Sequence, residues 1–204
     1  MAPQQRSFQK KQLRRILRER RHRLSASEQH LASQRLRDIL CQQDCYLKSH
    51  RIALYLANDG EIDPKGIAHQ AWQQGKQCFL PVLHPQRPGW LQFMPWLSST
   101  RMKKNRFGIP EPDANLYQPV PAWSLDLILL PLTGFDRKGH RMGMGGGFYD
   151  RTFAFIKTAE RIRSPQLIGL AHECQRVDHL PVDSRDVPLA AIASDRQFYT
   201  ITIT

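Results

Sequence analysis

The chain has 204 residues, 41% of them hydrophobic, and a formal net charge of +12. This composition can bury a core, which excludes a globally disordered chain, and the length predicts a single domain over residues 1–204. No apolar run is long enough to cross a membrane, and polar residues follow the basic start where a signal peptide would have its apolar stretch. We therefore expect a cytoplasmic protein with no membrane partner.

The excess positive charge is concentrated at the start of the chain. Residues 1–23 hold nine Lys or Arg and one acidic residue, whereas the remainder holds 21 basic and 17 acidic residues. A non-enzymatic RNA-binding protein that uses this basic segment is one alternative. Localised charge without a recognisable RNA-binding motif is not typical of such proteins, so we do not expect nucleic acid as the partner.

The four cysteines lack the paired spacing that is typical of zinc sites, so we expect reduced structural thiols. The stretch AHECQR begins like a zincin motif, but Arg176 occupies the position of the required second histidine. Neither pattern therefore predicts a zinc centre.

Two helices are predicted before the first strand. Apolar residues between Phe8 and Arg23 recur at helical spacing, which predicts an amphipathic helix with a basic outer face. Ser25 and Glu28 have the spacing of a capping box, and they predict the start of a second helix whose apolar residues continue to Leu40.

Six apolar runs predict β-strands, and they cover residues 51–57, 76–82, 90–96, 125–131, 166–171 and 188–193. Pro95 favours a place nearer an edge of the sheet for the third run. Between the strands, we expect a helix over residues 64–74 that Gly75 ends, an irregular segment over 109–121, and a helix over about 148–158.

Strands that alternate with helices, in near-continuous apolar runs, predict an α/β fold. We expect an open, mostly parallel sheet in a three-layer α/β/α sandwich, with the basic helix at its start. In open sheets of this kind, ligands bind beyond the carboxyl ends of the strands. This rule indicates the segments that follow Ala57, Pro131 and Ala171.

The stretch RMGMGGGFYDR, residues 141–151, places four glycines within five residues and an arginine at each end. It is not a Walker A sequence, and Phe148 takes the place of the third glycine of a dinucleotide-binding fingerprint. Consecutive glycines nevertheless let backbone N–H groups point at an anion ahead of a helix. We interpret the stretch as a phosphate-binding loop; a plain turn, with Asp150 favourable at the start of a helix, is the alternative.

The predicted first helix carries Lys10, Arg14 and Arg18 at the spacing i, i+4, i+8, so these residues share one stripe. Like charges stacked in this way repel each other, and an anionic ligand would offset the repulsion. A solvated charged face is the alternative interpretation.

Together these motifs resemble the 5-formyltetrahydrofolate cyclo-ligase family, also called methenyltetrahydrofolate synthetases. The resemblance rests on KKQLR, GEID, LDLILLP, GFDRKGHRMGMGGGFYDR and LPVDSRDVPL, in the family's order, between Lys10 and about Ile192. It implies an ATP-dependent cyclisation of 5-formyltetrahydrofolate to 5,10-methenyltetrahydrofolate with Mg²⁺, through a phosphorylated formyl intermediate, with release of ADP and phosphate. It leaves open whether the folate is polyglutamylated, and we expect a monomer.

The resemblance also implies roles for single residues. The ATP-contacting segments correspond to Lys10, Lys11, Gln12, Leu13 and Arg14, and to Arg141, Met142, Gly143, Met144, Gly145, Gly146, Gly147, Phe148 and Tyr149. The folate contacts correspond to Leu56, Glu61 and the loop from Met144 to Phe148, and the magnesium positions correspond to Asp150 and Asp186. The candidate catalytic residues are Arg14, Arg141, Tyr149 and Asp150.

The glycine loop departs from some relatives, which carry basic residues where this chain has Met144 and Gly146, and a tyrosine at the position of Phe148. The charge that binds the phosphates must then come from Lys10, Arg14, Arg141 or Arg151. A sugar-phosphate isomerase or a CoA-transferase relative is an alternative function, because such enzymes share the architecture and a glycine loop.

Overall fold

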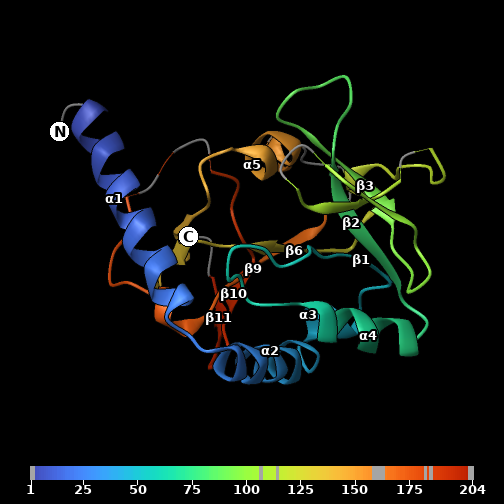
Figure 1. The fold of residues 1–204 in the computed structure, drawn as a ribbon, viewed down its shortest axis with the longest axis horizontal. Helices are drawn as coiled ribbons and strands as arrows, with labels where there is room; N and C mark the ends of the chain where they lie inside the picture. The colour runs from blue at the N-terminus through green and yellow to red at the C-terminus, as the bar shows by residue number, and fades with distance from the viewer. Residues whose placement is uncertain are drawn as a thin grey trace.

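The computed structural model describes residues 3–105, 108–113, 115–157, 164–181, 183 and 186–201. At its centre lies a seven-stranded sheet with the order β11-β10-β9-β6-β1-β2-β3 (Figure 1). The strands are β1 (Arg51–Ala53), β2 (Gln77–Leu83), β3 (Leu91–Pro95), β6 (Leu127–Pro131), β9 (Gln166–Leu170), β10 (Ala191–Ala193) and β11 (Phe198–Thr200). The five inner strands are parallel, and the edge strands β3 and β11 are antiparallel to their neighbours. The predicted mostly parallel α/β sheet is therefore confirmed, as is the edge position of the third run.

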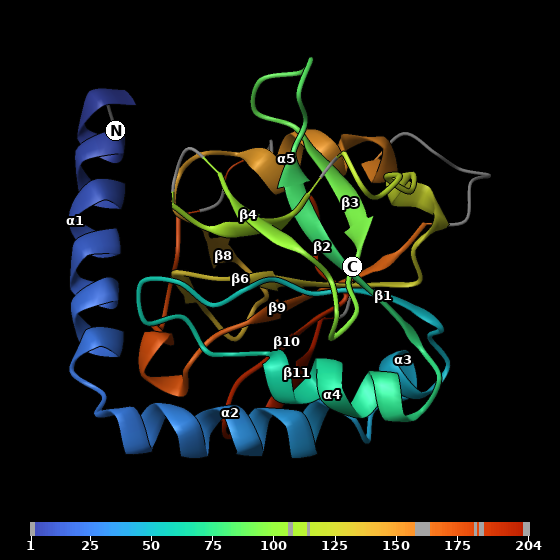
Figure 2. The same ribbon diagram turned by 45° about the vertical axis from the view of Figure 1, so that its right-hand side comes forward.

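Helices lie on both faces of this sheet. The α-helices are α1 (Pro3–His22), α2 (Ala26–Leu40), α3 (Asp44–Leu47), α4 (Lys65–Gln73) and α5 (Phe148–Thr152), and the short 3-10 helices are η1 (Ala122–Ser124), η2 (Ala154–Lys157) and η3 (Glu173–Gln175). Figures 1 and 2 show α2, α3 and α4 on one side of the sheet and α5 on the other. Two small ribbons, β4–β5 (Met102–Lys104 with Pro110–Pro112) and β7–β8 (Gly134–Phe135 with Arg141–Met142), lie outside the main sheet.

The core is divided between the two faces because successive residues of a strand point to opposite sides. In β6, Leu127 and Leu129 join the cluster that contains the buried residues of α2 and α4. Ile128 and Leu130 join the second cluster, which contains Phe153 at the end of α5. Near-continuous apolar strands are thus explained by burial on both faces.

Helix α1 packs across the carboxyl ends of β1, β6 and β9, as both views of the ribbon show (Figures 1 and 2). Its buried Leu17 lies so close to Gly134, just after β6, that a Cβ on this glycine would clash with it. On the β9 side, Arg20 donates a hydrogen bond of 3.5 Å to the carbonyl of Cys174. The basic helix therefore covers the edge at which α/β folds bind their ligands.

Several predicted boundaries need correction. The run 51–57 is a strand only as far as Ala53, because the chain then leaves the ladder towards α1, and the run 188–193 pairs only from Ala191. The helix predicted over 148–158 consists of α5 followed by η2, and position 158 lies outside the described residues. The segment predicted to be irregular contains β5, and α3 and β11 were not predicted. All of these elements are five residues long or shorter, so hydrophobic periodicity gives little signal for them.

The predicted start of the second helix and the glycine that ends the third are confirmed. Ser25 and Glu28 form the capping box that starts α2, and Gly75 follows α4 with a φ of +72°. All four cysteines are unpaired thiols. Within the described residues, no helix combines the length and the apolarity that crossing a membrane requires.

Candidate active site

A cavity of about 680 Å³ opens where α1, the glycine loop and the segment after β9 meet. Its lining includes Lys10 and Arg14 of α1, every residue from Arg141 to Arg151, and Asp183 and Asp186. Three stretches that are far apart in the sequence therefore form one cavity, large enough for a nucleotide. Most of the predicted ATP-contacting residues and both predicted magnesium positions are among them.

Some predicted site residues lie elsewhere. Lys11, Gln12 and Leu13 are on α1 but do not line the cavity, and the side chains of Lys11 and Gln12 are exposed to solvent. Leu56 is half-buried and packs against the core cluster of α2 and α4. Glu61 also lies outside this cavity, on the loop after β1.

The basic stripe of α1 faces the protein. Lys10 Nζ lies 3.5 Å from Asp183 Oδ2, and Arg14 Nε donates a hydrogen bond of 2.9 Å to the carbonyl of Gly143. Arg18 donates two hydrogen bonds to the Asp59 carboxylate, one from Nε at 2.7 Å and one from Nη2 at 2.9 Å. The alternative of a solvated stripe is therefore not supported, since groups of the protein itself offset the repulsion among its charges, whereas Lys11, Arg15 and Arg20 stay exposed on the basic outer face of the helix.

Asp59 is the anchor of α1, although the sequence analysis did not single it out. It has a left-handed backbone, with φ of +55°, and Arg21 donates to both its carbonyl (2.8 Å) and its carboxylate (2.5 Å). The Arg21 side chain is fully buried. Hydrogen bonds from Arg18, and secondarily from Arg21, lower the pKa of Asp59 to about 2. This clamp fixes the turn that carries Glu61.

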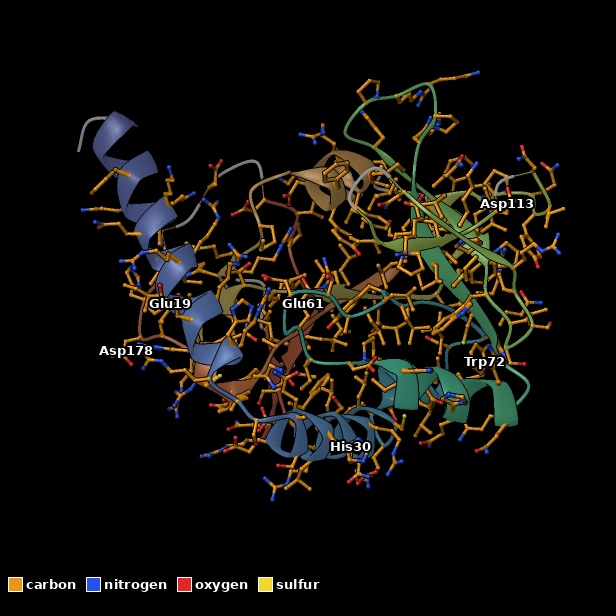
Figure 3. All side chains as sticks on the ribbon, in the orientation of Figure 1. Glu19, His30, Glu61, Trp72, Asp113 and Asp178 are labelled. Carbon is orange, nitrogen blue, oxygen red and sulfur yellow. The ribbon has the colours of Figure 1, made fainter. Side chains whose placement is uncertain are left out.

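Glu61 projects from that turn on the side of the sheet that faces α1 (Figure 3). The backbone N–H of Asn58 donates a hydrogen bond of 3.2 Å to its carboxylate. Burial raises the pKa of Glu61 to about 7, although the Arg21 charge opposes this shift. Burial and the Glu61 charge together raise the pKa of Tyr149, which also lines the cavity. Tyr149 thus connects the Glu61 environment with the glycine loop.

Two of the loop glycines have backbone conformations that favour glycine. Gly145 has a φ of +95° and Gly147 a φ of +63°, both in the left-handed region that other residues rarely adopt. A Cβ added to Gly145 would lie 3.4 Å from Cζ of Arg14. Positive φ angles therefore explain the glycines at 145 and 147, and Arg14 of α1 packs against the first of them.

Arg141 and Asp150 connect the two ends of the loop. Arg141 Nη2 donates to Asp150 Oδ1 at 2.5 Å, and Arg141 Nη1 donates to the carbonyl of Val187. The N–H of Val187 in turn donates to Asp150 Oδ1 at 3.2 Å. Burial raises the pKa of the neighbouring Asp186, and the charges of Asp150 and Asp183 add to this shift. The site therefore gathers three acidic side chains around one largely buried guanidinium.

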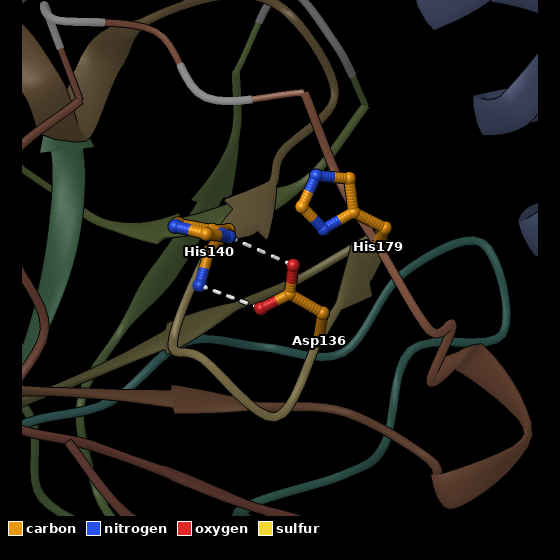
Figure 4. A group of neighbouring side chains, drawn as sticks. All are labelled: Asp136, His140 and His179. Carbon is orange, nitrogen blue, oxygen red and sulfur yellow. Dashed lines mark hydrogen bonds and ion pairs between the residues drawn. The ribbon is translucent and has the colours of Figure 1, made fainter.

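A second polar group, absent from the sequence analysis, joins the β7–β8 ribbon to the segment before Asp183 (Figure 4). The carboxylate of the buried Asp136 accepts hydrogen bonds from the backbone N–H groups of Lys138, His140 and Leu180, at 2.9–3.1 Å, and from His140 Nδ1 at 2.8 Å. These four bonds use the four lone-pair positions of a carboxylate. His179 lies nearby, with its ring 6.1 Å from that of His140. We infer that this group holds the β7–β8 ribbon and the segment before Asp183 against each other at the border of the cavity.

Comparisons with known proteins show the family to which the chain is similar. The model of the 5-formyltetrahydrofolate cyclo-ligase family matches residues 6–195. The 5-formyltetrahydrofolate cyclo-ligase of Haemophilus influenzae is 41% identical, with 88% of this chain and 94% of the relative aligned. The enzyme of that name from Escherichia coli K12 is 36% identical, with 88% and 96% aligned.

Solved structures show the same fold. The Aquifex aeolicus 5,10-methenyltetrahydrofolate synthetase superposes with a TM-score of 0.79 and 26% identity, covering 96% of this chain and 94% of that chain. The comparisons give no support to an isomerase, a CoA-transferase or an RNA-binding protein. The chain therefore belongs to the 5-formyltetrahydrofolate cyclo-ligase family.

Proposed function

We propose that this protein cyclises 5-formyltetrahydrofolate to 5,10-methenyltetrahydrofolate at the expense of ATP. The observation that carries the proposal is the cavity in which α1 and the 141–151 loop meet, in a chain that belongs to the cyclo-ligase family. A site of basic side chains and exposed backbone N–H groups suits the phosphates of ATP. The neighbouring Glu61 suits the N–H groups of a pterin.

The reaction needs activation because a formyl amide is a poor electrophile and its oxygen is a poor leaving group. Transfer of the ATP γ-phosphoryl group to the formyl oxygen releases ADP and creates a phosphate leaving group. The N10 nitrogen of the folate then attacks the activated carbon, and the C–O bond breaks as inorganic phosphate leaves. Catalysis of such a reaction consists mainly of positioning two anionic substrates and neutralising phosphate charge.

The residues divide between these tasks. Backbone N–H groups of the loop between Gly143 and Gly147 receive the phosphates, and Arg14 supplies charge at the α1 side. Arg141 donates to the carbonyl of Val187 and to Asp150, so it holds the loop against the segment that contains Val187. Its guanidinium also adds positive charge beside the loop. Their orientation is fixed before substrate binds, since each guanidinium is already hydrogen-bonded to backbone carbonyls or a carboxylate.

Glu61 and Tyr149 are assigned to the folate side of the site. An ionised Glu61 accepts hydrogen bonds from two N–H groups of the pterin, a charge-assisted arrangement that selects this ring. Tyr149 belongs to the glycine loop and its pKa is raised by the Glu61 charge, so we place it where the pterin and phosphate subsites meet. Leu56, packed on the core beside the same turn, provides an apolar wall for the ring.

Mg²⁺ fits the acidic side chains of the cavity. Carboxylate oxygens are the ligands that this ion prefers, and Asp150 and Asp186 provide them beside the loop. The raised pKa of Asp186, caused by burial and by neighbouring carboxylates, indicates a negative charge that a cation would relieve. When bound with ATP, Mg²⁺ would neutralise part of the phosphate charge.

We further propose that residues 1–204 form a single domain, because one sheet carries both core clusters. Four unpaired cysteines support a reducing, cytoplasmic location. A cavity lined by three segments of one chain supports a monomeric enzyme.

The proposal is tested by absorbance at the methenyl-folate band in a mixture of the protein, ATP, Mg²⁺ and 5-formyltetrahydrofolate. We expect the band to grow only in the complete mixture, and to stop growing when Mg²⁺ is chelated. ADP should appear in step with the product. ATP turnover without folate, or conversion of a sugar phosphate or an acyl-CoA in place of folate, would contradict the proposal.

A further inference from the structure

Arg151 lies in a cradle that two glycines create. Its Nε donates a hydrogen bond of 2.9 Å to the carbonyl of Gly89, and its Nη2 donates to the carbonyl of Gly146. A Cβ added to Gly89 would lie 2.5 Å from Nη2, and one added to Gly147 would lie 2.9 Å from Nη1. Both positions have positive φ, so the space for the guanidinium depends on glycine at each.

Two of the other basic side chains of the cavity, Lys10 and Arg141, differ from Arg151 in their partners. Lys10 lies beside Asp183, and Arg141 is paired with Asp150, so carboxylates offset both charges. Arg14 and Arg151 instead contact backbone carbonyls in the described part of the chain. These two arginines keep a net positive charge that an anion could receive.

These two guanidiniums also lie along the same stretch of the loop. Arg14 donates to the carbonyl of Gly143 and approaches Gly145, and Arg151 donates to the carbonyl of Gly146 beside Gly147. The Arg151 guanidinium lies 5.7 Å from the ring centre of Phe148, which holds it over the loop. Both arginines line the same cavity, so an anion between them would meet positive charge from two directions.

We propose that Arg151 is a second phosphate-binding residue, which receives the ATP phosphates beside Gly146 and Gly147, next to Arg14 of α1. This inference rests on the proposed function, because it assigns the ATP phosphates to this cavity. A guanidinium has five N–H donors in a fork that matches phosphate oxygens, and the two recorded carbonyl bonds leave donors for a ligand. The carbonyls of Gly89 and Gly146 orient the fork before ATP arrives.

A purely structural role is the competing explanation. In that case Arg151 only ties the turn between β2 and β3 to the glycine loop, and its charge is irrelevant to ATP. The two explanations differ in which substitutions should preserve the preference for ATP over AMP. A structural tie needs a group at position 151, whereas a phosphate contact needs positive charge beside the glycines of the loop, whichever residue supplies it.

The first test compares ATP and AMP binding to the wild type and to Arg151→Gln, without folate. We expect ATP affinity to fall roughly 10- to 100-fold, the range for a lost hydrogen bond to a charged group, while AMP affinity changes little. The ratio of the two affinities within one variant does not depend on its stability. Arg15→Gln is the matched control, since Arg15 on α1 is largely exposed and pairs only with Glu19 among the described residues.

The second test supplies the positive charge from a different residue of the loop. Met144 is half-exposed on the same loop, so Met144→Arg in the Arg151→Gln background restores a cation near the phosphates without restoring the tie to Gly89. We expect it to recover most of the ATP preference. An unchanged ratio of ATP to AMP affinity in Arg151→Gln, or recovery by Arg151→Lys but not by Met144→Arg, would overturn the proposal. Because no folate is present, these results are independent of whether cyclisation occurs.

Discussion

Gly145 is the residue at which the glycine loop depends most on backbone geometry. Its φ of +95° is a conformation that residues with side chains rarely adopt, and an added Cβ would lie close to Arg14. We expect Gly145→Ala to weaken ATP binding and Gly145→Val to weaken it further, because a β-branched side chain is bulkier and tolerates positive φ poorly. Titration with ATP, beside thermal melting of each variant, measures this effect.

Gly75 provides the matched control for backbone strain. It has a φ of +72°, and no described atom lies within 4 Å of an added Cβ. Gly75→Ala should lower the free energy of unfolding by about 1–2 kcal/mol through the same strain, and leave ATP affinity unchanged. If folded Gly145→Val binds ATP as tightly as the wild type, the loop is a plain turn and the phosphate assignment is wrong.

The pKa of Glu61, raised to about 7, makes folate binding sensitive to pH. The ionised carboxylate is the form that accepts hydrogen bonds from the pterin, so KM for folate should fall as the pH rises through about 7. Glu61→Gln should have a higher KM that no longer depends on pH in this range, while KM for ATP stays near the wild-type value. The same pH profile in both proteins would assign the titration to another group.

The same shift affects stability with a defined sign. The pKa of Glu61 is higher in the folded protein than its ordinary value of 4.5, so the folded state binds more protons between pH 4.5 and about 7. Stability from this group therefore falls as the pH rises through that window. Thermal melts of Glu61→Gln should show a weaker decline than the wild type over this interval.

The candidate site shows which residue roles a sequence can indicate. The loop 141–151 was predicted because it is a contiguous motif with chemistry of its own, and the family resemblance added Asp186. Asp59 and the buried Arg21 were not, because their importance lies in a contact between residues 38 positions apart. In the sequence alone, a basic helix and an acidic turn each resemble solvent-exposed segments, because only the fold shows that they contact each other.

At the scale of elements, the docking of α1 depends on one acidic residue. Asp59→Ala would remove the carboxylate that pairs with the fully buried Arg21 and with Arg18. A buried charge that loses its partner typically costs about 3–5 kcal/mol, so we expect a loss of that order in urea unfolding. ATP affinity should fall as well, because α1 carries Lys10 and Arg14 into the cavity.

Asp38→Ala is the control for this variant. Asp38 pairs with Arg37 on an exposed part of α2, where an ion pair contributes little to stability. It should leave both unfolding and ATP binding near the wild-type values. Equal stability of Asp59→Ala and Asp38→Ala would show that the Asp59 carboxylate is not needed to hold α1 in place.

Elements that bury continuous apolar surface were predictable, and those that depend on distant pairing were not. The strands β2 and β6 and the helix α2 follow from hydrophobic runs and a capping box. Strands β4, β5 and β11 are only three residues long, and β4 and β5 consist of lysine, methionine, proline and glutamate. Their pairing comes from tertiary contacts that local propensity does not encode.

For the whole molecule, the positive charge has an internal explanation. Most of the net +12 resides in the first helix, and there Lys10, Arg14, Arg18 and Arg21 contact loops at the carboxyl ends of the strands. The helix thus brings Lys10 and Arg14 of this stripe to one side of the cavity. Net charge alone does not show this arrangement, because it does not say toward which part of the protein the charged side chains point.

The cavity is formed by residues from the start, the middle and the end of the chain, so ATP binding should depend on the fold of the whole molecule. The lining needs α1, the 141–151 loop and the segment of Asp183 and Asp186 in place together, so ATP should bind the folded state alone. At a concentration of about 100 Kd it then adds about 2.7 kcal/mol to stability, which raises Tm by about 5–10 °C for a chain of this size. ATP should also slow tryptic cleavage at the exposed arginines of α1, and AMP at the same concentration should do so less. An ATP concentration that saturates turnover but leaves both Tm and cleavage unchanged would show that α1 is not part of the nucleotide site.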